Sequence, residues 1–329
     1  MKISIQKPQS IYELGLRDNQ EDWIFPKLGE ATEKSRLFIV CDGMGGYERG
    51  EVASQVVGET ISSYIIKHHT DDTTFDDDIL REAINEALNE LDKFASEDNS
   101  IRMGTTLALV FFHKGGCVMA HIGDSRIYHV RPSERRIIYK SRDHSLVYDL
   151  FQAEEITLEE MQSHPKKNII TRALMPNMGE RPTASIAHTA DIREGDCVYL
   201  CSDGMLEGMD DNDLLMILCA DDTIENKVEK LIISSYDNLD NHSAHLFYIN
   251  KVEQEDGDNE LATDEDIVRF NAIHLEEKEI DRQNDARPQI HKNYACFPKK
   301  DYKQLLIYII TLIIGFICAM ILLYFYKFL

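Results

Sequence analysis

The chain has 329 residues, with 35 lysines and arginines against 58 aspartates and glutamates, which gives a formal net charge of −23. Because a nucleic-acid backbone would repel such a surface, nucleic acid is not expected as a partner. The length allows one large domain or two modest ones, and either could bury a substantial core.

The cysteines indicate a reducing compartment. Seven are present, and no two of them form a Cys-x-x-Cys pair. Four lie in or beside apolar, strand-like runs, as reduced core thiols do: Cys41, Cys117, Cys197 and Cys201. The first ten residues contain no sustained apolar run, so no secretory signal is expected.

The first half of the chain alternates apolar runs with helical patterns. Residues 10–25 read as a polar turn between two strand-like ends, and the five apolar residues 37–41 predict a buried strand. Apolar residues at helical spacing predict helices over 52–68 and 76–95. Further strands are expected at 105–112, 117–123, 126–130 and 136–140, with a hairpin turn at 114–116.

The second half begins with a different kind of segment. Short polar helices near 149–153 and 158–164 lie among three prolines, which indicates an inserted flap at about 145–192. A strand, two helices and a last strand follow, at 197–201, 211–219, 224–236 and 244–249. Residues 1–252 are therefore expected to form the folded part of the chain.

The remaining residues predict a linker and a membrane anchor. Residues 253–304 are acidic in their first part and poor in large apolar side chains, so a mostly disordered linker is expected. Residues 305–325 carry no charge and are long enough to cross a hydrocarbon core of about 30 Å. The alternative, a buried core helix, rarely reaches this length without a polar face. A tail of four residues, 326–329, follows.

The flanking lysines predict the orientation of the anchor. Lys299, Lys300 and Lys303 precede the apolar segment, and only Lys327 follows it. The positive-inside tendency then places the preceding domain in the cytoplasm. The expected location is a membrane that the chain spans once, with the folded domain on the cytoplasmic side.

Four acidic residues lie next to predicted strands. Asp42, Asp124 and Asp203 each follow a buried strand, and Asp240 comes shortly before the last one. Carboxylates without nearby cysteine or histidine suit hard cations such as Mg²⁺ or Mn²⁺. Any single one reads as an ordinary turn. Together they predict a metal site, provided that these strands are neighbours.

A series of motifs resembles the metal-dependent serine/threonine phosphatases of the PPM, or type 2C, family, and most of all its bacterial members. They occur in family order from about residue 11 to 249: GLRDNQED (15–22), FIVCDGMGG (38–46), MGTTLAL (103–109), AHIGDSRIYHV (120–130), RDHSLV (142–147), EEITLEEMQSHPKKNIITRAL (154–174), GDCVYLCSDGM (195–205) and DNHSAHLFYI (240–249). The resemblance implies an α+β fold, a four-layer α-β-β-α sandwich with a flap, and a binuclear metal centre at one end.

The resemblance also implies the metal ligands, with Mn²⁺ or Mg²⁺ as the cofactor. Asp42 should bridge two ions, and the carbonyl of Gly43 should bind the second of them. Asp203 and Asp240 should complete the first. Asp124 matches the residue that supports a third, weaker ion in bacterial members.

Other matching positions concern water and substrate. Glu21 and Asp22 should hold water molecules around the metals, and Arg17 should grip the substrate phosphate with its planar fork of donors. Met44 departs from the animal enzymes, which have a histidine there as a proposed general acid. Methionine cannot donate a proton, so the source of the leaving-group proton stays open.

The implied activity is hydrolysis of phosphoserine and phosphothreonine in proteins by a water that two metal ions activate. A cysteine phosphatase would need a Cys-x5-Arg loop, and neither Cys41 nor Cys201 has arginine at that spacing. A catalytically inactive member that serves as a membrane scaffold or regulator is the alternative. The expected partners are phosphoproteins, an opposing serine/threonine kinase and the membrane.

Several polar residues are interpreted as structural. Asp196 is expected in a turn. Asp143 and His144 are expected in a buried turn, with catalysis as the less favoured alternative. Thr171 and Arg172 should anchor the flap. Arg172 has the alternative of assisting the substrate phosphate. Asp237-Asn238 is a competing register for Asp240-Asn241, which is preferred because it directly precedes the last strand.

Overall fold

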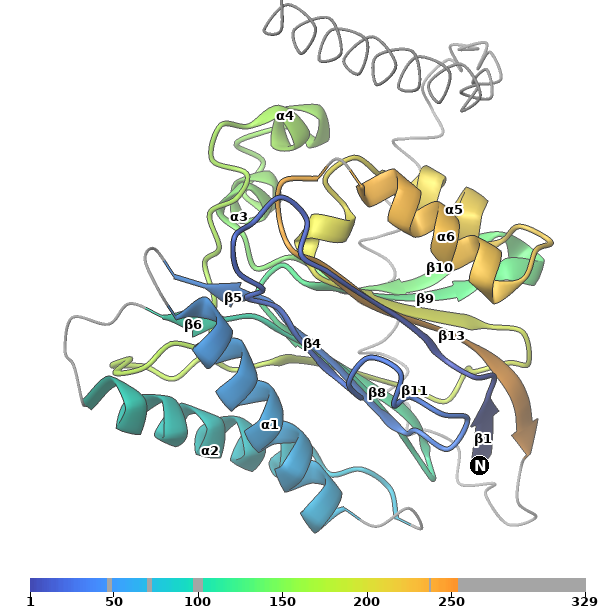
Figure 1. The fold of residues 1–329 in the computed structure, drawn as a ribbon, viewed down its shortest axis with the longest axis horizontal. Coiled ribbons are helices and arrows are strands. Elements are labelled where there is room, and N and C mark those ends of the chain that lie inside the picture. Colours follow the sequence, from blue (N-terminus) through green and yellow to red (C-terminus); the bar gives the residue numbers. More distant parts are fainter. Residues whose placement is uncertain (46–48, 70–72, 97–102, 237, 254–329) are drawn as a thin grey trace, which may run out of the picture. The chain divides into compact units, whose positions relative to one another are not determined.

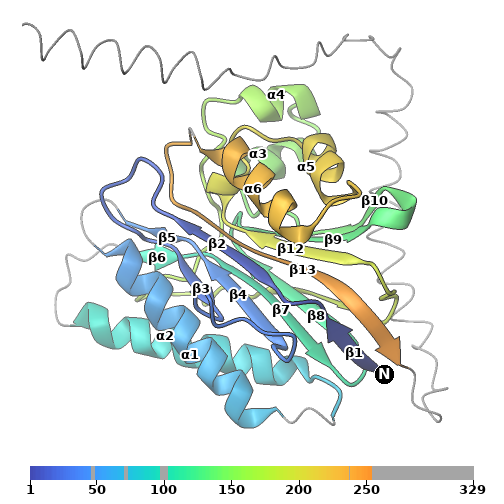
Figure 2. The ribbon, with the colours of Figure 1, turned by 45° about the vertical axis from the view of Figure 1, so that its right-hand side comes forward.

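The computed structural model describes residues 1–45, 49–69, 73–96, 103–236 and 238–253. They form two β-sheets packed face to face, with a pair of helices on the outer face of each sheet (Figures 1 and 2). The α+β, four-layer arrangement that the resemblance implied is therefore present. The predicted linker and the predicted span at 305–325 lie outside the described residues. Within the described ranges, no helix combines the length and apolar character that a membrane crossing requires.

The first sheet has the strand order β1-β13-β12-β9-β10, and β2 also pairs with β13. Its strands are antiparallel: β1 (Lys2–Ile5), β2 (Gln9–Glu13), β9 (Arg126–Arg131), β10 (Arg136–Lys140), β12 (Cys197–Cys201) and β13 (His242–Glu253). Strand β13 is longer at both ends than predicted, because β2 pairs with its first half and β1 with its second. Helices α5 (Asp211–Leu218) and α6 (Ile224–Ser235) cover the outer face (Figure 2).

The second sheet has the order β11-β8-β7-β4-β3 and is also antiparallel. Its strands are β3 (Trp23–Phe25), β4 (Leu37–Cys41), β7 (Leu107–His113), β8 (Gly116–Ile122) and β11 (Ser185–Thr189). A short ladder of β5 (Gly43–Met44) and β6 (Gly104–Thr105) continues from the end of β4. Helices α1 (Gly50–His68) and α2 (Asp77–Ser96) lie side by side on the outer face (Figure 1).

Burial on both faces explains why strand β4 is apolar throughout. Leu37, Ile39 and Cys41 pack among residues of α1 and α2, whereas Phe38 and Val40 face the other sheet. Phe38 stacks on Phe247 of β13 with ring centroids 4.2 Å apart, which joins the two sheets across the central core. The five described cysteines form no disulfide with one another.

The segment interpreted as a flap contains an unpredicted strand. Helices α3 (Leu146–Gln152) and α4 (Leu158–Ser163) lie near the predicted places, and Thr157 and Glu160 cap α4 reciprocally. Strand β11 lies within the same predicted range, but it pairs with β8 and belongs to the second sheet.

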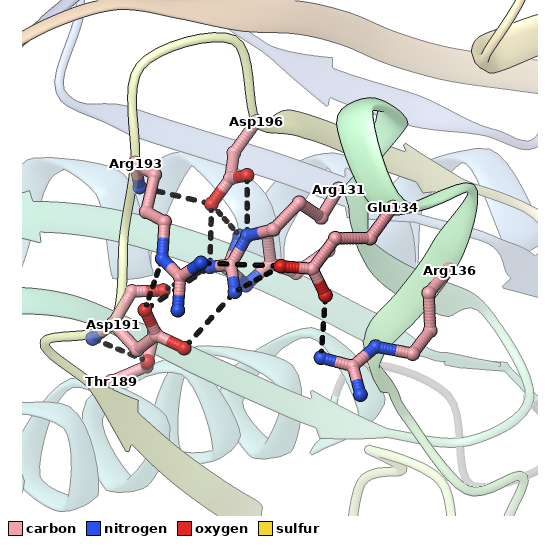
Figure 3. A network of polar contacts seen from close by, with 8 residues as sticks. Arg131, Glu134, Arg136, Thr189, Asp191, Arg193 and Asp196 are labelled. Atoms are coloured by element: carbon pink, nitrogen blue, oxygen red, sulfur yellow. Dashed lines mark hydrogen bonds and ion pairs between the residues drawn. The ribbon is translucent and has the colours of Figure 1, made fainter.

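A buried ionic network holds the loop that leads from β11 in one sheet to β12 in the other (Figure 3). Arg131, at the end of β9, donates from Nε and from a terminal nitrogen to the two carboxylate oxygens of Asp196, at 2.9 and 3.0 Å. His129 Nε2 lies 2.8 Å from the same carboxylate, and the backbone N–H of Arg193 donates to it at 2.9 Å. Asp196 is therefore a structural turn residue, as expected.

Candidate functional site

The sheet pairing gathers the predicted metal ligands at one end of the sandwich. In the first sheet, the end of β12 pairs with the beginning of β13, which brings the segments of Asp203 and Asp240 together. In the second sheet, the beginning of β7 lies between the end of β4 and the end of β8, which brings together the segments of Asp42 and Asp124. The condition set by the sequence, that these strands be neighbours, is met.

Two threonines clamp the backbone of Asp42. Its N–H donates to Thr106 Oγ1 at 2.9 Å. Its carbonyl accepts from the Thr106 N–H and from Thr105 Oγ1, also at 2.9 Å. Three hydrogen bonds on one residue fix its backbone at the end of β4, the point from which the carboxylate projects.

Glycine is required after Asp42. The Gly43 N–H donates to the carbonyl of Glu21 at 3.1 Å. A Cβ on Gly43 would clash with that carbonyl and with the carbonyl of Gly50 at the start of α1. Only a residue without a side chain lets these backbone segments approach so closely.

The carboxylates raise one another's pKa values. Burial raises the pKa of Asp42 well above its usual range. Repulsion by four nearby carboxylates raises it further: Asp22, Asp203, Asp124 and Asp240. Burial and the nearby charges also raise the pKa of Asp124 to about 8. The pKa of Asp203 is raised by burial and Asp240, although a hydrogen bond with Asp42 opposes this. Asp22 lies in the same cluster, where burial is the main cause that raises its pKa to about 7.

The donor chemistry fits divalent cations. One carboxylate oxygen of Asp124 and one of Asp203 are buried with no hydrogen-bond partner. Among the described residues, no group of three or more histidine, cysteine, aspartate or glutamate side chains already lies close enough together to hold a metal ion. The acids of the cluster nevertheless offer only oxygen ligands, and a bound cation would remove their mutual repulsion.

Arg17 lies beside the cluster and contacts one of its carboxylates. Its guanidinium donates to Asp240 Oδ2 at 2.6 Å, and its side chain is 52% exposed. The sequence predicted phosphate as the ligand of this residue, whereas here it forms an ion pair with a predicted metal ligand.

Asn241 was not predicted as a site residue, although it is buried and holds the loop that carries Arg17. Its side-chain oxygen accepts from the Glu21 N–H at 2.8 Å. Its amide nitrogen donates to the carbonyls of Leu14 and Asn19, at 2.8 and 3.0 Å. The loop between β2 and β3 and the segment before β13 accordingly lie side by side (Figures 1 and 2). In the sequence, the direct neighbourhood of Asn241 to the predicted ligand Asp240 was the signal that could have identified this residue.

The two acids predicted to hold water differ in their surroundings. Asp22 is buried and accepts a hydrogen bond from Ser202 Oγ at 2.9 Å. Glu21 is less buried, and burial and the neighbouring Glu51 raise its pKa. Asp22 is thus tied to the strand end that carries Asp203.

The remaining sequence candidates have structural partners. Asp143 accepts two hydrogen bonds from Arg126, at 2.7 and 2.5 Å, which gives it a structural role, although its side chain is partly and not fully buried. Arg172 donates to the carbonyl of Thr183 at 3.1 Å, which agrees with an anchoring role. Asn238 donates to the carbonyl of Gly204, and Asp237 lies outside the described residues.

The fold and the site together define a class of protein, and comparison with known proteins identifies it. Residues 21–232 match the family model described as Protein phosphatase 2C. The chain therefore belongs to the protein phosphatase 2C family.

Proteins of similar sequence are named as protein phosphatases. The serine/threonine phosphatase stp of Listeria innocua is 31% identical over 218 residues, which cover 64% of this chain and 84% of the relative. Protein phosphatase PhpP of Streptococcus pneumoniae is 27% identical over 241 residues, which cover 73% and 95% of the two chains.

Solved structures agree in fold. The Mycobacterium tuberculosis serine/threonine phosphatase PstP/Ppp superimposes with a TM-score of 0.63 at 28% identity, over 75% of this chain and all of the other. The catalytic domain of PstP in complex with two manganese ions has a TM-score of 0.62 at 26% identity, over 76% of this chain and all of the other.

Proposed function

We propose that this chain is a metal-dependent phosphatase that hydrolyses phosphoserine and phosphothreonine in proteins. The observation that carries the proposal is the family match, which spans Asp42, Asp124 and Asp203. Those three acids lie in one buried cluster, and the named relatives are serine/threonine phosphatases.

The chain's own groups would hold two divalent cations, Mn²⁺ or Mg²⁺, and a third more weakly. Asp42, Asp203, Asp240 and the carbonyl of Gly43 are the proposed ligands of the pair, and Asp124 is a ligand of the third. When bound, the cations would supply a water that is activated near neutral pH and would neutralise the charge of the substrate phosphate. Thr105 and Thr106 would hold the backbone of Asp42 in place before the cations bind.

Arg17 is the proposed phosphate-binding residue. Its guanidinium presents donors in a fork that matches two oxygens of a phosphate. Since the side chain is half-exposed, it can exchange Asp240 for substrate without disturbing the core. Met44 on β5 has no proton to donate, so the serine or threonine oxygen takes its proton from water or from another group.

Removal of the metal is expected to stop the reaction. Phosphate release from a phosphothreonine peptide should require added Mn²⁺, cease with excess EDTA and return when Mn²⁺ is restored, because the carboxylates alone cannot activate water. A colorimetric phosphate assay measures each state. Turnover that resists EDTA would contradict the mechanism.

The same assay tests the alternative of an inactive scaffold or regulator. All the predicted ligand positions are occupied by oxygen donors, which favours an active enzyme. Absence of phosphate release with both Mn²⁺ and Mg²⁺ would favour the inactive alternative.

We also propose that residues 305–325 anchor the enzyme in a membrane, such as a bacterial inner membrane, with the catalytic domain in the cytoplasm. The uncharged segment and the three lysines before it support this proposal. Confinement to a membrane would raise the local concentration of the phosphatase near a membrane-associated serine/threonine kinase, which we propose that it opposes.

Deletion of residues 300–329 is expected to move the protein from the membrane fraction to the supernatant. The full chain should resist a high-salt wash, because apolar insertion does not depend on ionic contacts. Fractionation followed by immunoblotting measures this. The truncated protein should still hydrolyse p-nitrophenyl phosphate, since the family match ends at residue 232. A truncated protein that stays in the membrane fraction would refute the anchor.

A further inference from the structure

We propose that His144 is a positioning residue that holds the turn of Asp124 and connects it to the base of the flap. The effect on turnover rests on the proposed function, whereas the effect on the turn itself does not. His144 is not assigned contact with substrate.

Two hydrogen bonds join His144 to the residue before Asp124. Its backbone N–H donates to the carbonyl of Gly123 at 2.9 Å. Its ring Nδ1 accepts from the N–H of Gly123 at 3.0 Å. Both polar groups of the Gly123 backbone are therefore bound by one residue, immediately before the proposed ligand.

The opposite side of the turn is closed by Thr106. Gly123 has a φ of +101°, and a Cβ there would lie 2.6 Å from Thr106 Cγ2. The hydroxyl groups of Thr106 and Ser125 are hydrogen-bonded at 2.6 Å. Since Thr106 also clamps Asp42, the turn is held between Thr106 and His144, and loss of His144 would release one side.

The ring of His144 is itself fixed in orientation. It stacks on His121 with centroids 4.6 Å apart and planes inclined by 9°. Its Nε2 lies 3.0 Å from Ser185 Oγ on β11, whereas the Arg172 guanidinium, 3.3 Å from the same nitrogen, has only donors and forms no hydrogen bond with a protonated Nε2. Because Nδ1 accepts from Gly123, the proton of the neutral ring is on Nε2, and Ser185 Oγ accepts it.

Burial keeps this ring neutral. Desolvation, together with the neighbouring His121 and Arg172, lowers the pKa of His144 to about 3. The ring therefore remains an acceptor for the Gly123 N–H throughout the working range of an enzyme.

The base of the flap connects the turns of both proposed ligands. The Thr171 N–H donates to the carbonyl of His144 at 2.8 Å. Three residues on, Leu174 and Thr105 exchange two backbone hydrogen bonds of 2.9 Å. Thr105 clamps Asp42, so residues 171–174 join that turn to the turn that His144 holds.

Asparagine and glutamine at position 144 separate the two ring contacts. The side-chain oxygen of asparagine falls near the place of Nδ1 and can accept from the Gly123 N–H. The longer glutamine amide reaches the place of Nε2 and leaves that N–H without its acceptor. His144→Ala removes both contacts.

We expect His144→Ala and His144→Gln to lower kcat for p-nitrophenyl phosphate about tenfold, whereas His144→Asn stays within about threefold of the wild type. KM should be nearly unchanged, because Arg17 is not affected. His188→Ala, an exposed histidine of β11 that contacts Asp77, is the matched control and should leave kcat unchanged.

Amide hydrogen exchange measured by NMR gives a readout without metal or substrate. The Gly123 N–H should exchange faster in His144→Ala and His144→Gln than in the wild type, and His144→Asn should retain protection. If His144→Ala fails to fold, the comparison of His144→Asn with His144→Gln still tests the proposal. The proposal would be overturned if His144→Asn and His144→Gln lost kcat and Gly123 protection to the same extent. It would also be overturned if both variants kept the kcat and the amide exchange rate of the wild type. A wild-type chain without phosphatase activity would refute the proposed function and leave the exchange experiment decisive for His144.

Discussion

Asp42→Ala is expected to abolish phosphate-ester hydrolysis, with kcat/KM for p-nitrophenyl phosphate reduced by a factor of about a thousand or more. Asp42 follows directly on β4, its backbone is held by Thr105 and Thr106, and its carboxylate interacts electrostatically with four other acids. Substitution removes the group proposed to be shared between two cations. Asp203→Ala and Asp240→Ala should have similar effects, because each removes a ligand from the same centre.

The loss should not result from unfolding. In the metal-free protein, the buried carboxylate of Asp42 is repelled by its neighbours, which is destabilising. Removal of its charge therefore lowers the electrostatic repulsion within the cluster. The isosteric Asp42→Asn variant should therefore unfold, without metal, at the same temperature as the wild type or a higher one. Calorimetry of the metal-free proteins measures this. Near-normal turnover by any of the three alanine variants would refute the proposed site.

Strand β4 shows why some of the fold could be predicted from the sequence. Five consecutive apolar residues occur where a strand is covered by helices on one face and by a second sheet on the other. The predicted bounds of this strand coincide with the observed ones. Helices α1 and α2 were predicted within two residues at each end, since each buries one continuous face.

Strand β11 shows the limit of this reasoning. Its sequence, SIAHT, is short and only partly buried, and it lies at the edge of the sheet with β8 as its one neighbour. Such a strand lacks the strong alternation that periodicity detects. Its place in the sheet depends on pairing with β8, more than 60 residues earlier in the chain.

The functional site likewise contains residues that the sequence predicted and residues that it did not. The acids were predicted because strand ends and motif order mark them in the sequence. The roles of Asn241 and His144 depend on hydrogen bonds to backbone groups that are distant in sequence, such as the carbonyl of Leu14 and the N–H of Gly123. No residue pattern encodes which distant backbone group a side chain will reach. Positioning residues of this kind become visible only in the folded chain.

The second large effect is expected at the other end of the sandwich, in the network around Asp196 (Figure 3). Burial alone would raise the pKa of this carboxyl, but hydrogen bonds from His129, Arg131 and the backbone of Arg193 lower it to about 2. Asp196 is the buried counter-ion of Arg131, whose own side chain is also buried. Removal of the negative charge would leave that guanidinium in the core with only the partly exposed Asp191 and Glu134 as acidic partners.

Asp196→Asn is therefore expected to lower the free energy of unfolding by about 3–5 kcal/mol, the usual cost of breaking a buried ion pair from one side. Asp191→Asn is the matched control; because Asp191 is 50% exposed, its loss should cost about 1 kcal/mol or less. Urea denaturation of the three proteins measures both values. The folded-state pKa of Asp196 lies below its ordinary value of 3.8, so its stabilisation is complete above about pH 5 and is lost as the pH falls toward 2. The gap between wild type and Asp196→Asn should accordingly narrow in acid. A gap below 1 kcal/mol at neutral pH, or one that does not change with pH, would show that this network does not hold the loop between β11 and β12.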